Sequence, residues 1–176
     1  ATMMNKGLEI VEACWLFNTG PETIKVVVHP QSIVHSMVQF VDGSVVAQLG
    51  QPDMRTPIAY SLAWPDRCES GVENLDIYSV GQLEFERPDY ERFPCLRLAG
   101  DSFARGGTAP TILNAANEVA VQGFLDRKLR FTQIPQLVEY ALEKIPSADV
   151  RSLDDVLEAD AESRDVVNAQ LKVISL

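Results

Sequence analysis

The sequence predicts an α+β fold, with a helix and a small antiparallel sheet, an extended connection, and a carboxyl-terminal four-helix bundle. β-branched runs around an Asp-Gly turn signal lie in the first third of the chain, whereas helical periodicity dominates from residue 90 onward. Hydrophobic residues make up 46% of the 176 residues, which is enough for a core. We therefore divide the chain into segments 1–63, 64–89 and 90–176.

The first segment begins with a helix and continues into a hairpin. Leu8, Val11 and Trp15 recur at helical spacing, which predicts a helix over 6–17. The Asp-Gly pair at 42–43 is a strong signal for a two-residue hairpin turn. The other elements that we predict here are strands over 24–28, 33–40 and 44–49 and a helix over 56–63 that Thr56 caps.

The remaining two segments differ in periodicity. Residues 64–89 contain scattered turn residues and one candidate strand over 83–86, so we expect a connection that packs along the surface. Ser152 with Asp155 resembles a capping box ahead of the last helix. The predicted helices of the bundle cover 94–105, 111–125, 132–145 and 152–174.

Composition excludes several classes of function. A net charge of −10 argues against non-specific binding to nucleic acid or to an anionic membrane. No run of apolar residues is long enough to span a membrane. Cys14, Cys68 and Cys95 are odd in number and far apart, so we expect no disulfide framework and a reducing, cytoplasmic setting. Because the chain opens directly into a helix, we interpret it as a fragment.

The densest polar group is formed by Asn5, Lys6 and Glu9. Asn5 and Glu9 are four residues apart, so they share a helix face, and Lys6 lies nearby. An amide, an ammonium and a carboxylate together suit a polyhydroxylated anion and one metal ion. Spacing alone favours the simpler interpretation, a solvated helix start with a Lys6–Glu9 ion pair.

Other candidate residues give weaker signals. His29 and His35 are the only histidines, and a strand histidine with a backbone partner is the simpler explanation for either. Asn114 and Asn117 lie inside an apolar helix, where we expect hydrogen bonding between helices. No GxSxG, GxGxxG or Walker A run occurs, so neither a serine hydrolase nor a nucleotide loop is indicated.

Four longer motifs identify a family. In order and spacing they resemble those of the 1-deoxy-D-xylulose 5-phosphate reductoisomerases. The motifs are ATMMNKGLE at 1–9, HPQSIVHSM at 29–37, GQPDMRTPI at 50–58 and LNAANE at 113–118. Several long motifs in register are far more specific than any one alone.

The resemblance implies an oxidoreductase and isomerase of the non-mevalonate isoprenoid pathway. Such enzymes rearrange and reduce 1-deoxy-D-xylulose 5-phosphate to 2-C-methyl-D-erythritol 4-phosphate, with NADPH as reductant and Mn²⁺ or Mg²⁺ as the metal. The resemblance further implies a homodimer that uses the sheet. It implies a location in the bacterial cytoplasm or, alternatively, in a plastid-type organelle.

The resemblance also assigns roles residue by residue. Glu9 matches a metal ligand, and Lys6 and Glu9 are the expected catalytic residues. Asn5, Lys6 and His35 match substrate-binding positions. Met54 matches an apolar contact to the cofactor, over the nicotinamide or substrate region.

The chain departs from the family pattern by what is absent. We find no amino-terminal dinucleotide-binding domain and none of the further metal carboxylates that the family carries upstream. The 176 residues alone are therefore expected to be inactive. The alternative is a non-catalytic dimerisation or scaffold module, in which Val34, Val38 and Phe40 of the hairpin form an interface.

Overall fold

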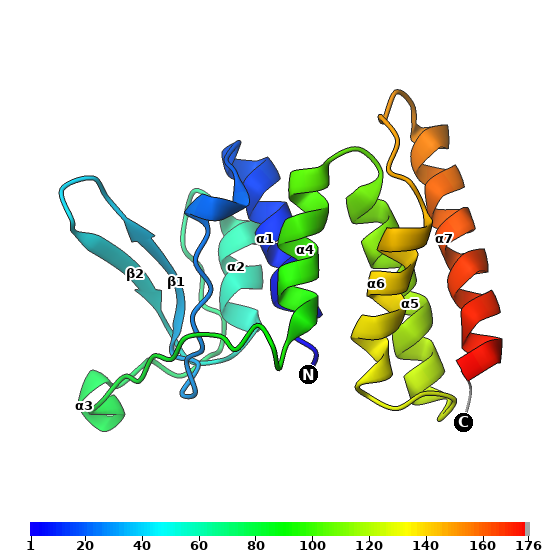
Figure 1. Ribbon diagram of the computed structural model, residues 1–176. Helices are drawn as coiled ribbons and strands as arrows, with labels where there is room; N and C mark the ends of the chain where they lie inside the picture. Colours follow the sequence, from blue (N-terminus) through cyan, green and yellow to red (C-terminus); the bar gives the residue numbers. More distant parts are fainter. Residues whose placement is uncertain (175–176) are drawn as a thin grey trace. The chain divides into compact units, whose positions relative to one another are not determined.

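The computed structural model describes residues 1–174, which contain seven α-helices, one 3₁₀ helix and a two-stranded antiparallel sheet (Figure 1). The predicted α+β class is confirmed. The chain forms two compact units, one made of residues 1–26 and 89–176 and the other of residues 27–88. This division differs from the three predicted segments, because the first helix packs with the carboxyl-terminal helices.

The four helices that we predicted in the last segment are present. Helix α4 has the predicted bounds, and the other three begin or end within a few residues of theirs. The helices of this unit are α1 (Met4–Phe17), the 3₁₀ helix η1 (Pro21–Thr23), α4 (Pro94–Arg105), α5 (Ala109–Leu125), α6 (Gln133–Lys144) and α7 (Leu153–Ile174).

The core of this unit lies around α5, which packs against α4, α6 and α7. Small side chains let the neighbouring helices approach closely, because Ala115, Ala116 and Ala120 are fully buried. Larger apolar side chains fill the space between them. These include Ile112, Leu113, Ile134, Leu137, Val138 and Val167. Burial of such side chains is the main stabilising contribution to the fold.

The predicted capping box at the start of α7 is confirmed. The backbone N–H of Asp155 donates to Ser152 Oγ over 3.3 Å, and the N–H of Ser152 donates back to Asp155 Oδ2 over 2.7 Å. The backbone N–H groups of Arg151 and Ser152 hold the pKa of the Asp155 carboxyl below its usual range.

The second unit contains the hairpin. Strand β1 (Val34–Gln39) pairs antiparallel with β2 (Val45–Leu49), and Val38 lies opposite Val46. Helix α2 (Arg55–Ala63) begins one residue before the predicted start, so the predicted cap at Thr56 is wrong: Thr56 lies inside the helix and Met54 is at the cap position. The short helix α3 (Ile77–Val80) lies in the predicted connection.

The predicted strands over 24–28 and 83–86 are wrong, because only one isolated bridge forms, between Val28 and Glu86. Pro30 follows closely and cannot donate to a ladder. Hydrogen bonds from side chains connect the two segments instead. His29 Nδ1 donates to the Glu84 carbonyl over 2.7 Å, and the N–H of Glu84 donates to the Gln31 side chain over 3.3 Å.

Helix α1 joins the first unit through Gly7. A Cβ built on Gly7 would lie 2.6 Å from Ala99 Cβ and 3.2 Å from the Cys95 carbonyl oxygen. Both of these atoms belong to α4, so the backbone of α1 at Gly7 packs directly against the Ala99 side chain and the Cys95 carbonyl group of α4. A side chain at residue 7 would force the two helices apart.

We therefore expect Gly7→Ala to destabilise the chain. Overpacking costs about 1–3 kcal/mol, which outweighs the gain of about 1 kcal/mol in helix propensity. Gly100→Ala in α4 is the matched control, because a Cβ there meets no heavy atom within 4 Å. It should stabilise the chain by about 0.4–1 kcal/mol. Urea unfolding measures both, and a Gly7→Ala chain as stable as the control would contradict the close contact.

Candidate functional site

The start of α1 positions the predicted polar cluster. Thr2 Oγ1 accepts the N–H of Met4 over 3.2 Å, and Met3 has a left-handed backbone with φ of 59°. The helix therefore begins at Met4, and Asn5, Lys6 and Glu9 all lie in its first two turns. Gly7 faces α4, so the cluster is on the exposed side of the helix.

The structure brings the three predicted side chains together. Asn5 Nδ2 donates to Glu9 Oε1 over 2.6 Å, and Lys6 Nζ lies 2.7 Å from Glu9 Oε2. The Lys6 and Glu9 side chains are 52% and 45% exposed, so a ligand can reach both. Each carboxylate oxygen has one donor and keeps a further lone pair. The group is thus an exposed, hydrogen-bonded anion–cation pair.

The described residues supply only part of a metal site. Hard divalent cations bind several oxygen ligands. Within residues 1–174, no group of three or more His, Cys, Asp or Glu side chains is placed to hold a metal ion. Glu9 fits such a cation as one carboxylate ligand, and the others would have to come from elsewhere in an assembled site.

His35 and Met54 line one cavity in the second unit. The cavity has a volume of about 280 Å³, and His35, Gln51 and Met54 are part of its wall. His35 Nε2 lies 3.2 Å from the Gly50 carbonyl oxygen. A carbonyl only accepts, so Nε2 carries the proton and Nδ1 remains an acceptor. The loop 50–54 therefore brings together two residues that the sequence separates by nineteen positions.

The loop that carries Met54 is held by an ion pair. Asp53 accepts from the Arg55 guanidinium, with 2.7 Å between Asp53 Oδ2 and Arg55 Nη2. This contact holds the pKa of the Asp53 carboxyl below its usual range and raises the pKa of Arg55. Met54 itself is 71% exposed.

His29 has a structural role, as the simpler interpretation predicted. Its ring stacks on Phe85 with 4.7 Å between ring centroids, and its Nδ1 is taken by Glu84. It is absent from the wall of the cavity that His35 lines. The sequence alone could not separate the two histidines, because both lie in the same motif.

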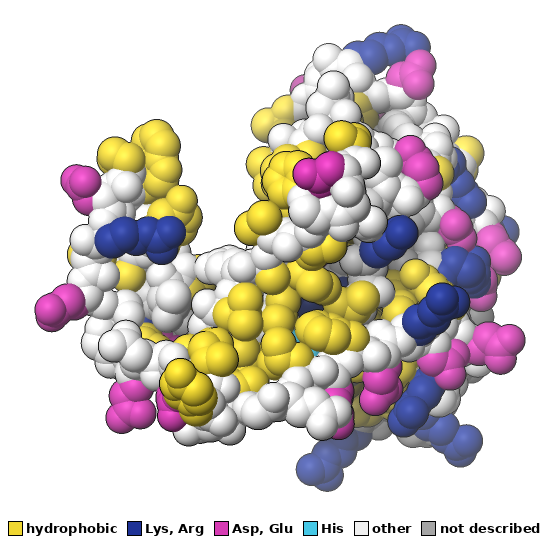
Figure 2. Space-filling view, turned by 90° about the vertical axis from the view of Figure 1, so that its left-hand side faces the viewer, with side chains coloured by type: hydrophobic (Ala, Val, Ile, Leu, Met, Phe, Trp, Pro, Cys, Tyr) yellow, Lys and Arg dark blue, Asp and Glu magenta, His cyan; other side chains and the backbone are white. Residues whose placement is uncertain are grey.

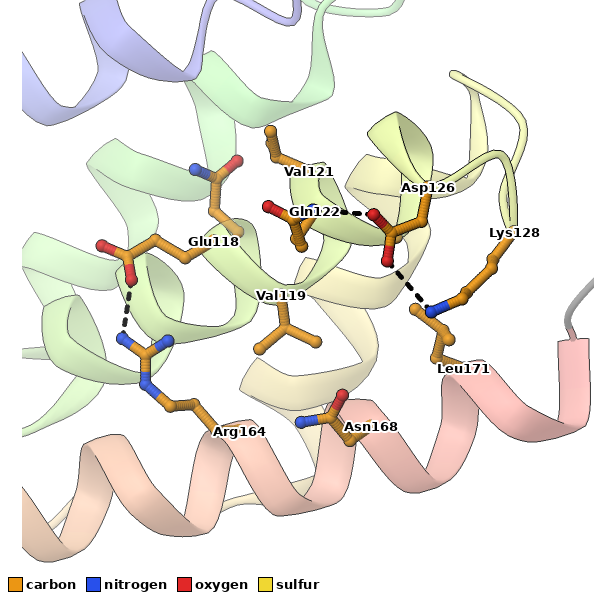
Figure 3. Close-up of a pocket in the computed structure, with 11 residues that line it drawn as sticks. Glu118, Val119, Val121, Gln122, Asp126, Lys128, Arg164, Asn168 and Leu171 are labelled. Carbon is orange, nitrogen blue, oxygen red and sulfur yellow. Dashed lines mark hydrogen bonds and ion pairs between the residues drawn. The ribbon is translucent and has the colours of Figure 1, made fainter.

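Sequence reasoning missed a larger cavity, of about 610 Å³, beside α5 and α7 (Figure 3). Glu118 and Arg164 form an ion pair of 2.7 Å at one part of its wall, and Asp126 and Lys128 form another of 3.0 Å. Arg164 also contacts Asp160, and both carboxylates raise its pKa. The hydrogen bonding between helices that we expected of Asn114 and Asn117 does not occur among residues 1–174. Asn114 Nδ2 donates over 3.2 Å to Glu118 of the same helix, and Asn117 Oδ1 is buried without a hydrogen-bond partner.

None of the helices within residues 1–174 combines the length and the apolar character needed to cross a bilayer.

Comparison with known proteins finds one family that matches this chain. Residues 49–166 match the family model described as the DXP reductoisomerase C-terminal domain. The 1-deoxy-D-xylulose 5-phosphate reductoisomerase of Nitrosococcus oceani is 61% identical over 172 residues, which are 98% of this chain and 44% of that protein. The corresponding protein of Nitrosomonas eutropha is 58% identical over 97% of this chain and 41% of its own length.

Solved structures agree in fold. The reductoisomerase from Zymomonas mobilis in complex with NADPH superposes with a TM-score of 0.92 and 51% identity, over 97% of this chain and 45% of that one. A DOX-P reductoisomerase in complex with NADPH, fosmidomycin and magnesium gives a TM-score of 0.93 and 45% identity, over 98% of this chain and 45% of that one.

This chain spans less than half the length of the relatives that it matches. Because the family model covers more than half of the chain, and because motifs, identity and fold agree with it, the chain belongs to the DXP reductoisomerase family.

Proposed function

We propose that this chain is part of an enzyme that converts 1-deoxy-D-xylulose 5-phosphate to 2-C-methyl-D-erythritol 4-phosphate, a step of the non-mevalonate isoprenoid pathway. NADPH is the reductant and Mn²⁺ or Mg²⁺ the metal. The observation that carries the proposal is the exposed Asn5–Lys6–Glu9 cluster in a chain of this family. Structures of relatives with NADPH and magnesium support the same cofactors.

Glu9 is the proposed metal ligand of this chain. Its carboxylate is exposed and is a hard oxygen donor of the kind that Mg²⁺ and Mn²⁺ prefer. A bound divalent cation would polarise the substrate oxygens as a Lewis acid. Asn5 and Lys6 hold the Glu9 carboxylate from two sides and so restrict its orientation before a ligand arrives.

Lys6 and Asn5 are the proposed substrate contacts beside Glu9. The Lys6 ammonium has three donor hydrogens, and its pairing with Glu9 uses one, so it can also donate to a substrate oxygen. Asn5 has a second amide hydrogen and a carbonyl oxygen for hydroxyl groups. Their half-exposed positions leave both groups accessible to a sugar phosphate.

His35 and Met54 are proposed to contact the substrate and the cofactor. The His35 Nδ1 lone pair can accept from a hydroxyl group, because Nε2 already donates to Gly50. The Met54 side chain is exposed at the same cavity and offers a polarizable surface for a flat ring such as nicotinamide.

We expect Glu9→Gln in the full-length enzyme to reduce kcat/KM by roughly a hundredfold or more, because metal stabilisation of transition-state charge contributes several kcal/mol. Apparent metal affinity should fall in parallel. Glu12→Gln is the matched control, since Glu12 is an exposed carboxylate further along α1. Steady-state NADPH oxidation at a series of Mn²⁺ concentrations measures both effects, and equal losses in the two variants would contradict the assignment.

We further propose that the 176 residues alone do not turn over substrate. They contain no GxGxxG or Walker A run, and residues 1–174 contain no group of three metal-binding side chains. The purified chain should therefore leave NADPH unoxidised in the presence of substrate and Mn²⁺, while the full-length enzyme oxidises it under the same conditions. Measurable oxidation by the 176-residue chain would disprove this.

The hairpin supports a second proposal, that the enzyme is a homodimer through its sheet. Val38 and Val46 are cross-strand partners on one face of the hairpin, and they are 56% and 62% exposed. Figure 2 shows hydrophobic side chains gathered in patches on the face that it draws. Exposed apolar strands of this kind are stabilised by a partner. The scaffold interpretation of the chain is thus compatible with the enzymatic one.

Val38→Lys should convert the dimer of the full-length enzyme to monomer, because a charge would be buried without a partner at the interface. Gln39→Lys is the control on the opposite face of the same strand. Sedimentation equilibrium reports the oligomeric state. If Val38→Lys remains dimeric, the interface lies elsewhere.

The proposed enzyme works in a reducing compartment, the bacterial cytoplasm. Its three cysteines are free, and the relatives reported above are bacterial proteins.

A further inference from the structure

We infer that Asp53 and Arg55 are positioning residues that set the direction of Met54, and through it the binding of NADPH. The inference rests on the proposed function, because it concerns the ring that Met54 contacts. We call the pair the Asp53–Arg55 clasp. Its two members flank Met54 in the sequence and close a short ring of contacts around the Met54 backbone.

The clasp is a multiple contact. The Asp53 carboxylate accepts from Arg55 Nη2 over 2.7 Å and from Arg55 Nε over 3.1 Å to each oxygen. Asp53 Oδ1 also accepts the backbone N–H of Arg55 over 2.9 Å. Two-pronged pairing of guanidinium with carboxylate defines geometry better than a single contact does. The residue between them therefore has little freedom in its backbone.

Further contacts connect the clasp to its surroundings in the same unit. Arg55 Nη1 donates to the Gly71 carbonyl over 3.3 Å, which ties the clasp to the segment that follows α2. The N–H of Thr56 donates to the Asp53 carbonyl over 3.2 Å, and the N–H of Ile58 to the Met54 carbonyl over 3.2 Å. The clasp thus sets where α2 begins, with Met54 at its cap position.

Met54 depends on this backbone because packing contributes little to its position. Its side chain is 71% exposed, yet it lines the same cavity as His35 and Asp53. A thioether gains contact with a flat aromatic ring only where it meets the ring. The ligand class that suits this surface is the nicotinamide ring of the reductant. If the clasp were loosened, the Met54 side chain would keep its chemical character but would sample more orientations.

The test uses the full-length enzyme with Arg55→Gln, which removes the charge pairing. We expect KM for NADPH to rise roughly tenfold, the change that about 1.4 kcal/mol of lost binding produces, with a smaller change in kcat. Arg55→Lys keeps the charge but not the fork and should show a similar rise. Asp42→Asn is the control, because Asp42 also accepts a backbone N–H two residues on but is no part of the cavity wall.

A double-mutant cycle separates positioning from general stability. If the clasp acts through Met54, then Arg55→Gln should add almost nothing to the effect of Met54→Ala on KM for NADPH. An undiminished effect of Arg55→Gln in the Met54→Ala background would overturn the inference. So would an equal rise in KM in the Asp42→Asn control.

A second measurement does not depend on catalysis. Backbone ¹⁵N relaxation of the full-length enzyme without NADPH should show a lower order parameter for the Met54 amide in Arg55→Gln and Arg55→Lys than in the parent or Asp42→Asn. Unchanged order at Met54 would overturn the clasp even in an active enzyme. A parent enzyme that does not oxidise NADPH would instead contradict the proposed function, and the relaxation result would still decide the clasp.

Discussion

The close contact between Gly7 of α1 and Ala99 of α4 is the constraint on which the first unit and its polar cluster depend. It brings α1 against the carboxyl-terminal helices, which have a core of their own around α5. The Asn5–Lys6–Glu9 cluster is on the other side of α1, so its position is defined by a well-packed helix pair although its side chains are exposed. Exposed functional groups on a rigid element keep their geometry better than groups on a free loop.

The two candidate sites use different means to order exposed side chains. In α1 the candidate groups order each other, because Asn5 and Lys6 both contact the Glu9 carboxylate. At the loop before α2, the ordering groups are Asp53 and Arg55, and the residue of interest is Met54. Isolated surface ion pairs contribute little to the free energy of folding. In this chain such ion pairs therefore matter chiefly because they fix the orientation of neighbouring groups.

Much of the fold follows from the sequence where periodicity and end signals agree. Helix α4 was predicted with its observed bounds, because Pro94 at its start and the Gly106-Gly107 pair at its end both punctuate the chain. The strand over 24–28 failed because β-branched residues suit a strand but do not supply a partner, and Pro30 limits the pairing. Short-range signals cannot report which distant segment is available to pair.

The candidate sites show the same limit. The grouping of Asn5 with Glu9 follows from helix geometry and needed no tertiary information. The shared cavity of His35 and Met54 depends on how the loop over 50–54 folds back on β1, which spacing along the chain does not determine. The ion pair between Glu118 and Arg164 joins two helices far apart in sequence, so no local pattern indicated it.

The division of the chain has a consequence for synthesis on the ribosome. The first unit is discontinuous, since residues 27–88 form the second unit between α1 and α4. Helix α4 is made roughly 80 residues after α1, which takes on the order of 10 s at about 5–20 residues per second. During that interval the face of α1 around Gly7 and Ile10 has no α4 to cover it. The apolar face of α1 therefore stays uncovered throughout this interval of synthesis, which gives chaperones that bind such surfaces time to act on it.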